Sequence, residues 1–160
     1  MKKIINPFVD LKQSTGYSCF GCSPSNNNGL KMEFLEEGDE IVSHWNPDRK
    51  FEGFLNILHG GIQATLIDEI ASWVVFVKLK TGGFTSELQV RYLKSVMIDK
   101  GRITLRASIK EMEKNIAHVQ VSLYDGEENL CSEGVASYFT LPEKIAVAKM
   151  NYPGIDSFYE

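Results

Sequence analysis

One long apolar segment, residues 60–80, constrains the fold of this chain more than any other feature. It has room for about five helical turns, and its apolar side chains recur at spacings of three and four residues. These apolar residues leave only a narrow polar stripe on the helix. They are Ile62, Leu66, Ile67, Ile70, Trp73, Val74, Val75, Phe76, Val77 and Leu79. Such a helix is stable only when other elements surround it, and the sequence offers no second helix of this length.

The segments on either side of this helix have the patterns of β-strands. Residues 30–35 and 40–45 flank a turn-prone stretch and predict a hairpin, while residues 84–93, 102–110, 116–124 and 131–141 alternate apolar and polar side chains. Two strands, one helix and four strands joined by short turns favour an α+β fold, in which a curved antiparallel sheet wraps the helix.

Length and turn signals suggest a single domain with two appendages. A chain of 160 residues can bury one core of its own. Turn-forming residues crowd positions 19–29, so residues 1–29 are predicted to be an irregular arm before a domain over residues 30–141. Residues 142–160 are predicted to be a tail, with no structure assigned to residues 151–160.

Composition argues against several classes of partner. The formal net charge is −4 and no block of like charges occurs, so no nucleic-acid partner is expected. No signal-peptide pattern is found and no run approaches the roughly 20 apolar residues of a membrane span, so we expect a cytoplasmic protein without a membrane partner. Three cysteines, an odd number, fit a reducing compartment.

Residues at the start of the predicted helix could take part in catalysis. Gly60 and Gly61 follow His59, and glycines allow a substrate to approach a helix start closely. Unpaired amides and the positive end of the helix dipole could polarise a thioester carbonyl there. These residues alone are equally compatible with a tight turn into the helix.

Two carboxylates interrupt the apolar helix at Asp68 and Glu69. A carboxylate on such a helix is costly to bury unless it is paired or functional, and Asp68 is the stronger candidate. Asp68 lies about 10 Å along the axis from Gly61, too far for both to act on one reacting atom. If they share a substrate they belong to different copies of the chain, which predicts an active site across a homodimer interface.

The sequence Leu-His-Gly-Gly-Ile-Gln-Ala-Thr-Leu-Ile-Asp over residues 58–68, followed by Thr-Ser-Glu-Leu-Gln-Val-Arg-Tyr-Leu-Lys over residues 85–94, resembles the PaaI-like acyl-CoA thioesterases, which have the hotdog fold. The similarity covers roughly residues 19–141 and includes Cys-Phe-Gly-Cys at residues 19–22 and Asn-Gly-Leu at residues 28–30. An acid nine residues after the histidine of His-Gly-Gly is its most specific element.

This resemblance implies hydrolysis of an acyl-CoA by a homodimer or homotetramer, with no cofactor besides the coenzyme A of the substrate. Gly61 would bind the thioester oxygen through its amide, and Asp68 of the opposing subunit would act as general base or nucleophile. Thr85, or less favourably Ser86, would place a hydroxyl near Asp68. Further substrate contacts are expected from the loop before the helix, the helix itself and two lysines: Asn56, His59, Gly60, Glu69, Lys94 and Lys114. Asn56 could instead be a turn residue.

Other interpretations remain open. Cys19 and Cys22 have the spacing of half a zinc site or of a redox pair, but no second pair exists, so no metal site is predicted. A hydratase would need an Asp and a His five residues apart near the helix, and only Asp39 and His44 match that spacing. A module that binds acyl-CoA without hydrolysing it would share the pocket. The acyl group is not readable, although Phe54, Leu58, Trp73 and Phe76 could line its pocket.

Overall fold

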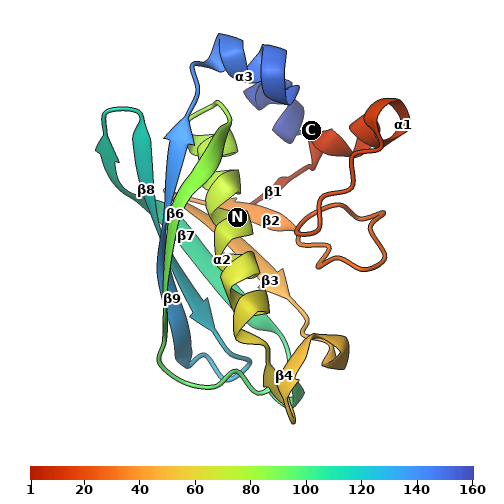
Figure 1. Ribbon diagram of the computed structural model, residues 1–160, viewed down its shortest axis with the longest axis vertical. Helices are drawn as coiled ribbons and strands as arrows, with labels where there is room; N and C mark the ends of the chain where they lie inside the picture. The colour runs from red at the N-terminus through yellow and green to blue at the C-terminus, as the bar shows by residue number, and fades with distance from the viewer.

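A seven-stranded antiparallel sheet wraps the long helix α2, Gly60–Lys78, in the computed structural model, which describes residues 1–160 apart from the side chains of Lys12 and Gln13 (Figure 1). The strand order is β1-β2-β3-β7-β8-β9-β6. The strands are β1 (Lys2–Ile4), β2 (Phe34–Glu37), β3 (Glu40–Trp45), β6 (Gly83–Tyr92), β7 (Ile103–Glu113), β8 (Ile116–Tyr124) and β9 (Leu130–Thr140). A separate pair is formed by β4 (Glu52–Phe54) and β5 (Ile57–Leu58). The predicted hotdog fold is confirmed.

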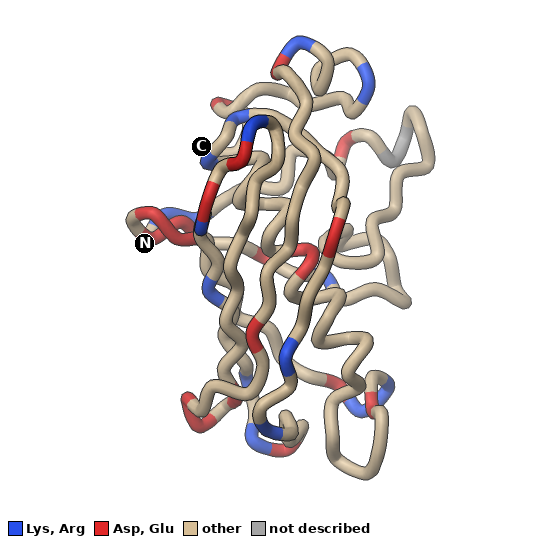
Figure 2. The backbone as a smooth tube through the Cα atoms, turned by 60° about the vertical axis from the view of Figure 1, so that its left-hand side comes forward, with Lys and Arg blue, Asp and Glu red and all other residues tan. Residues whose placement is uncertain are grey.

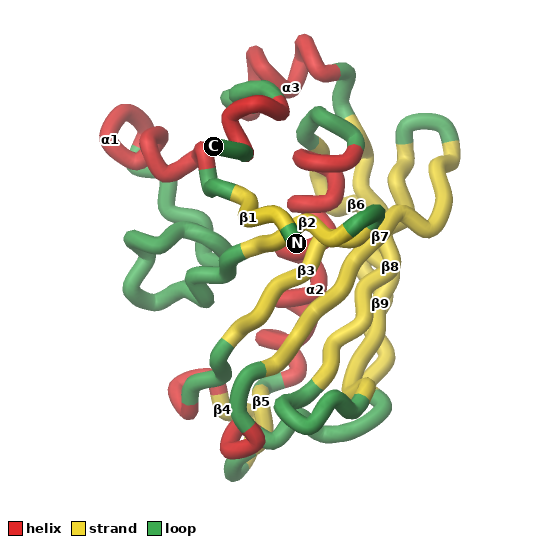
Figure 3. The backbone as a smooth tube through the Cα atoms, turned by 180° about the vertical axis from the view of Figure 1, so that it is seen from behind, coloured by secondary structure: helices red, strands yellow, loops and turns green.

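The core lies between α2 and the inner face of the sheet. Leu66, Ile67 and Ile70 of the helix are fully buried, as are the alternate residues Ile103 and Leu105 of β7. Each such side chain contributes roughly 1.5–3 kcal/mol of transfer free energy. Figure 3 shows from behind how the strands cross the helix.

The helix α2 corrects one expectation from the sequence. By length and composition it could cross a membrane, so the statement that no segment approaches this size was wrong. A helix at the centre of a protein core has the same character, and half of this segment is buried inside the structure. Figure 2 shows acidic and basic positions interspersed along the chain.

The N-terminal arm is more ordered than predicted. It contains the strand β1 and two short helices, η1 (Pro7–Asp10) and α1 (Leu11–Thr15). The strand β1 extends the sheet by pairing with β2. A strand of three residues is too short for a periodic pattern to reveal it. The predicted hairpin is also shifted, because β2 begins at Phe34 and Leu30 instead accepts a hydrogen bond from Trp45 Nε1 at 2.7 Å.

The C-terminal tail is also structured, contrary to the prediction for residues 151–160. It contains α3 (Glu143–Met150) and η4 (Ile155–Phe158). Phe158 is fully buried, with its ring 5.7 Å from that of Trp73 and 5.8 Å from that of Phe8. Tyr152 donates a hydrogen bond to the carbonyl of Phe76 at 2.8 Å. An aromatic cluster therefore joins arm, tail and helix.

The opposite side of the sheet ends in an unpaired edge. Within the described residues, β6 pairs with β9 alone, and its outer edge has no neighbouring strand. Two aromatic side chains of this strand, Phe84 and Tyr92, are 58% and 53% exposed. A ten-residue edge with exposed aromatic groups is a surface on which a second strand can pair.

Candidate active site

Asp68 lies in the middle of α2, and two hydroxyl groups donate hydrogen bonds to its carboxylate. Thr85 Oγ1 on β6 is 2.8 Å from Asp68 Oδ1, and the Tyr138 hydroxyl on β9 is 2.7 Å from the same oxygen. The Tyr138 hydroxyl is also 2.7 Å from the Asp68 carbonyl oxygen. Burial, and then the charge of Asp68, raise the pKa of Tyr138 above its ordinary value, so it stays a donor at neutral pH.

Tyr138 is the site residue that the sequence analysis missed. It is opposite Thr85 in the β6–β9 register. Apolar alternation in residues 131–141 marks Tyr138 only as a core residue, because a tyrosine on an inward position normally contributes its ring. Knowing which strands pair would have revealed it, since cross-strand partners face the same side.

A β-bulge separates the roles of Thr85 and Ser86. Thr85 pairs with Tyr138 and Glu87 with Ser137, so Ser86 is an extra residue in β6. The Ser86 hydroxyl donates to the Ser137 carbonyl at 3.0 Å, whereas Thr85 reaches Asp68. Of the two candidates, the structure therefore brings Thr85 to the carboxylate.

The helix start has an unusual cap. His59 is the N-cap of α2, and its Nδ1 accepts a hydrogen bond from the Gly61 amide at 2.9 Å. The Tyr92 hydroxyl of β6 donates to the Gly60 carbonyl at 2.7 Å and fastens this turn to the sheet. The Gly61 N–H is thus directed at the surface but already has an acceptor. Within one chain it stays about seven residues, roughly 10 Å, from Asp68 along the helix axis.

The predicted substrate-binding lysines lie at different places. Lys94 and Gly60 line one cavity of about 360 Å³ together with Tyr92 and Gln63. The Gln63 Oε1 atom is buried and has no hydrogen-bond partner among the described residues. Lys114 instead lies in the β7–β8 turn beside Ser86, at a separate cavity of about 460 Å³. One chain does not bring the two lysines together.

Asn56 is a turn residue in the structure. Its φ of 59° is left-handed, and its side-chain Oδ1 accepts from the Asp99 amide at 3.0 Å. Its own amide donates to Glu52 Oε2 at 2.9 Å. These bonds hold the loop before α2 in place, so of the two roles left open by the sequence the structure supports the turn.

Glu69 points away from Asp68 toward the N-terminal arm. Its carboxylate oxygens are both 3.6 Å from Cys19 Sγ, and Trp73 Nε1 donates to Oε1 at 3.2 Å. Burial, and then the charge of Cys19, raise the pKa of Glu69 to about 7. A side-chain hydrogen bond with Cys22 lowers the pKa of Cys19 to about 5, and the same bond together with burial raises the pKa of Cys22. Glu69 therefore belongs to a second polar cluster with Cys19 and Cys22.

Several other candidates lie outside the Asp68 site. Trp73 is buried and stacks on Phe34 with ring centroids 4.4 Å apart, while Phe54 is 72% exposed. His44 Nδ1 pairs with Thr104 Oγ1 at 2.9 Å, and Asp39 is exposed in the β2–β3 turn. No hydrogen bond among the described residues links this hydratase-like pair to Asp68.

Comparison with known proteins gives a consistent result. The thioesterase superfamily profile matches residues 55–132. A curated protein from Saccharolobus solfataricus is 29% identical to this chain over 116 residues, and its name describes it provisionally as an esterase. The match covers 72% of this chain and 75% of the relative.

Solved structures share the fold. A thioesterase from Haemophilus influenzae has a TM-score of 0.65 at 23% identity, and the match covers 75% of this chain and 85% of that protein. A Streptococcus mutans protein, solved bound to acetyl CoA, has a TM-score of 0.63 at 17% identity. The match covers 70% of this chain and 90% of that protein. Together with the sheet wrapped around α2, these likenesses show the hotdog fold, and the profile makes the chain similar to the thioesterase superfamily over residues 55–132.

Proposed function

We propose that the protein is an acyl-CoA thioesterase that acts as a homodimer, with Asp68 as its catalytic carboxylate. The observation that carries this proposal is the pair of hydroxyl groups, from Thr85 and Tyr138, that donate to Asp68 Oδ1. They fix the orientation of a carboxylate that has no cationic partner among the described residues. A positioned carboxylate without an ion pair is suited to accept a proton.

The arrangement supports general-base catalysis. Both hydroxyl donors bind Oδ1, so Oδ2 is the oxygen that would hold a water molecule. That water adds to the thioester carbon while its proton passes to Oδ2. The tetrahedral intermediate then expels the coenzyme A sulfur, which takes the proton from Asp68. The products are the free acid and coenzyme A, and the carboxylate is regenerated.

The N–H of Gly61 would donate a hydrogen bond to the thioester oxygen and stabilise the negative charge that develops on it. In the isolated chain this N–H donates to His59 Nδ1, so the substrate oxygen would replace the imidazole as acceptor. His59 would then have the accessory role of holding the amide until substrate arrives. The cavity beside Gly60 and Lys94 gives the substrate an approach to this helix start.

A homodimer is required because one chain separates Gly61 from Asp68 by about 10 Å. The unpaired β6 edge supports a dimer in which the sheets of two copies join. Thr85 is on that strand, so such pairing would place the partner close to Asp68. Acetyl CoA bound to the related Streptococcus mutans protein supports a CoA thioester as the ligand.

The direct test is the rate of thiol release from a panel of acyl-CoA esters by Asp68→Asn. We expect the rate to fall by about a hundredfold or more, with ester binding by calorimetry retained. Asp39→Asn is the matched control, because Asp39 is exposed in a turn and is the acid that a hydratase would need. Equal turnover by Asp68→Asn and the unchanged protein would contradict the proposal, and binding without turnover in the unchanged protein would point to a non-catalytic acyl-CoA module.

A further inference from the structure

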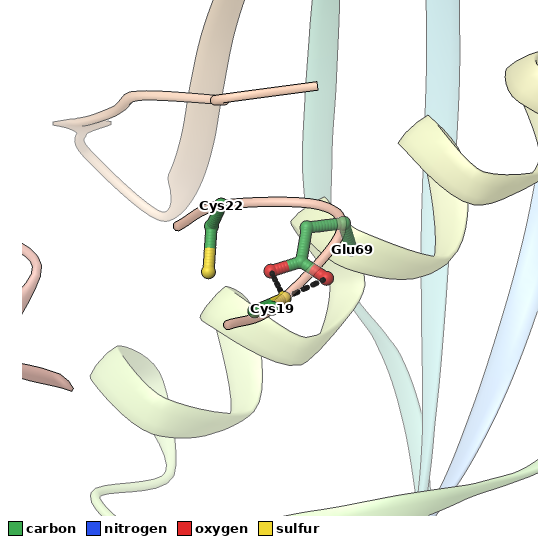
Figure 4. Close-up of side chains that lie close together, drawn as sticks. All are labelled: Cys19, Cys22 and Glu69. Carbon is green, nitrogen blue, oxygen red and sulfur yellow. Dashed lines mark hydrogen bonds between the residues drawn. The ribbon is translucent and has the colours of Figure 1, made fainter. Parts of the chain in front are cut away.

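A loop of the N-terminal arm places two thiols against a carboxylate of the central helix (Figure 4). Cys19 Sγ, Cys22 Sγ and a Glu69 oxygen all lie within 4.8 Å of one another. Cys22 is 4% exposed, and Cys19 and Glu69 are half-buried. The cysteine spacing gave only half of a metal site, and the fold supplies a third ligand from a residue 50 positions away.

The separations match tetrahedral zinc. With Zn–S near 2.3 Å and Zn–O near 2.1 Å, a tetrahedral angle puts sulfur and oxygen about 3.6 Å apart and two sulfurs about 3.8 Å apart. Both Cys19–Glu69 distances are 3.6 Å. The remaining separations, at most 4.8 Å, need to shorten by at most about 1.2 Å, which side-chain rotation can supply.

The fold holds these ligands in place without help from an ion. The loop is fixed by backbone hydrogen bonds from Leu30 to the Phe20 carbonyl at 2.7 Å and from Met32 to the Gly21 carbonyl at 2.9 Å. A Cβ on Gly21 would lie 2.4 Å from the Glu69 carboxyl carbon, so only glycine allows this close approach. Trp73 Nε1 donates a hydrogen bond to Glu69 Oε1 and orients the carboxylate, as an outer partner of a metal ligand does.

The charges also favour a cation. Three groups that can carry negative charge share a mostly buried cluster, and no Lys, Arg or His among the described side chains forms an ion pair with Glu69. Two thiolates and one carboxylate suit zinc, whereas magnesium and calcium prefer oxygen ligands alone. A cavity of about 320 Å³ reaches Cys19 and Glu69 and could admit the ion and a water as fourth ligand.

We propose that Cys19, Cys22 and Glu69 bind one Zn²⁺ ion, which fastens the N-terminal arm to α2. This site goes beyond the thioesterase function, because Glu69 faces the arm while Asp68 faces β6 and β9. An ion bound here would cross-link Cys19 and Cys22 with Glu69, which lies far from them in the chain. The free energy of ion binding would add to the stability of the folded state.

The experiment measures metal bound to the full chain, purified under reducing conditions, stripped with a chelator and reloaded with Zn²⁺ or Co²⁺ alone. We expect one zinc per chain by elemental analysis, and with Co²⁺ the absorption bands of tetrahedral thiolate coordination. Cys22→Ser should abolish both, and Glu69→Gln should weaken zinc binding by at least about tenfold. Cys131→Ser is the control, because this buried cysteine lies outside the cluster and should bind zinc normally.

Three results would overturn the proposal. They are no zinc or cobalt uptake by the unchanged protein, equal binding by Glu69→Gln, or an equal loss in Cys131→Ser. The Co²⁺ titration of the unchanged protein does not depend on whether a variant folds, and circular dichroism checks the variants. Thiol counting in air before chelation, with reductant removed, distinguishes the redox alternative: three persistent free thiols fit a zinc site, which protects its ligands, whereas rapid loss of two identifies a Cys19–Cys22 disulfide and rejects the metal.

Discussion

The Tyr138 hydroxyl donates to both the carboxylate and the backbone carbonyl of Asp68, at 2.7 Å each. A single buried group on β9 thus fixes the side chain and the helix turn that carries it. The Asp68 rotamer is therefore set by the sheet, in which the β6–β9 register places Thr85 opposite Tyr138. Changes at Tyr138 should affect catalysis more than binding.

Tyr138→Phe should lower kcat for acyl-CoA hydrolysis by about tenfold to a hundredfold with little change in KM. The expected loss corresponds to one hydrogen bond to a charged group, about 1.5–3 kcal/mol. The measurement is steady-state thiol release. Tyr152→Phe is the matched control, because it removes another tyrosine hydroxyl, whose acceptor is the Phe76 carbonyl about two helical turns further along α2 than Asp68. Similar losses in both variants would show a general effect on packing.

Thr85→Val should lower kcat by about tenfold, because it keeps the side-chain shape and removes the other donor to Asp68. Thr85→Ser retains the hydroxyl and should keep most of the activity. Ser86→Ala should change the rate by less than about twofold, since its hydroxyl is bonded to the Ser137 carbonyl. If Ser86→Ala is the more damaging change, the assignment of Thr85 is wrong.

A shared active site predicts complementation between two inactive variants. Asp68→Asn and Gly61→Pro each remove one half of every site, and proline is tolerated in the first helical turn. A random mixture of refolded subunits contains mixed dimers with one intact site, so about a quarter of the normal activity should return. The measurement is thiol release before and after co-refolding.

No recovery in mixed dimers, isolated through a different affinity tag on each variant, would place Gly61 and Asp68 in separate functions. Circular dichroism of each variant alone controls for loss of the helix. Recovery without any dimer in solution would exclude pairing through β6 as the source of the shared site.

Phe158→Ala should destabilise the fold by about 3–5 kcal/mol, the usual cost of removing a buried phenylalanine ring. Its ring packs with those of Phe8 and Trp73, so the loss would loosen both arm and tail. Urea unfolding followed by tryptophan fluorescence measures the change. Phe54→Ala is the control, since Phe54 is 72% exposed and its removal should cost less than about 0.5 kcal/mol. Equal effects would contradict the closed aromatic cluster.

Local patterns in the sequence predicted the elements with long, regular periodicity. The helix was expected at residues 60–80 and forms over Gly60–Lys78, and the four strands after it were found within a few residues. These predictions succeed because helix and strand periodicity is written in neighbouring residues.

Contacts between distant segments could not be predicted in the same way. Tyr138 meets Asp68 across 70 positions and Cys19 meets Glu69 across 50, and neither pairing leaves a local pattern. The tail was left unassigned because Tyr152 and Phe158 are isolated aromatic residues, whose burial depends on a partner surface made by Phe8 and Phe76.

The imidazole that caps Gly61 bears on selectivity for the proposed reaction. A ligand oxygen can gain this amide only by exchanging one acceptor for another, so a neutral carbonyl gains little net free energy from the contact. A tetrahedral oxyanion is a far stronger acceptor and gains much more from the same exchange. The cap would thereby make the helix start discriminate against the ground state and in favour of the species that forms as the thioester bond breaks.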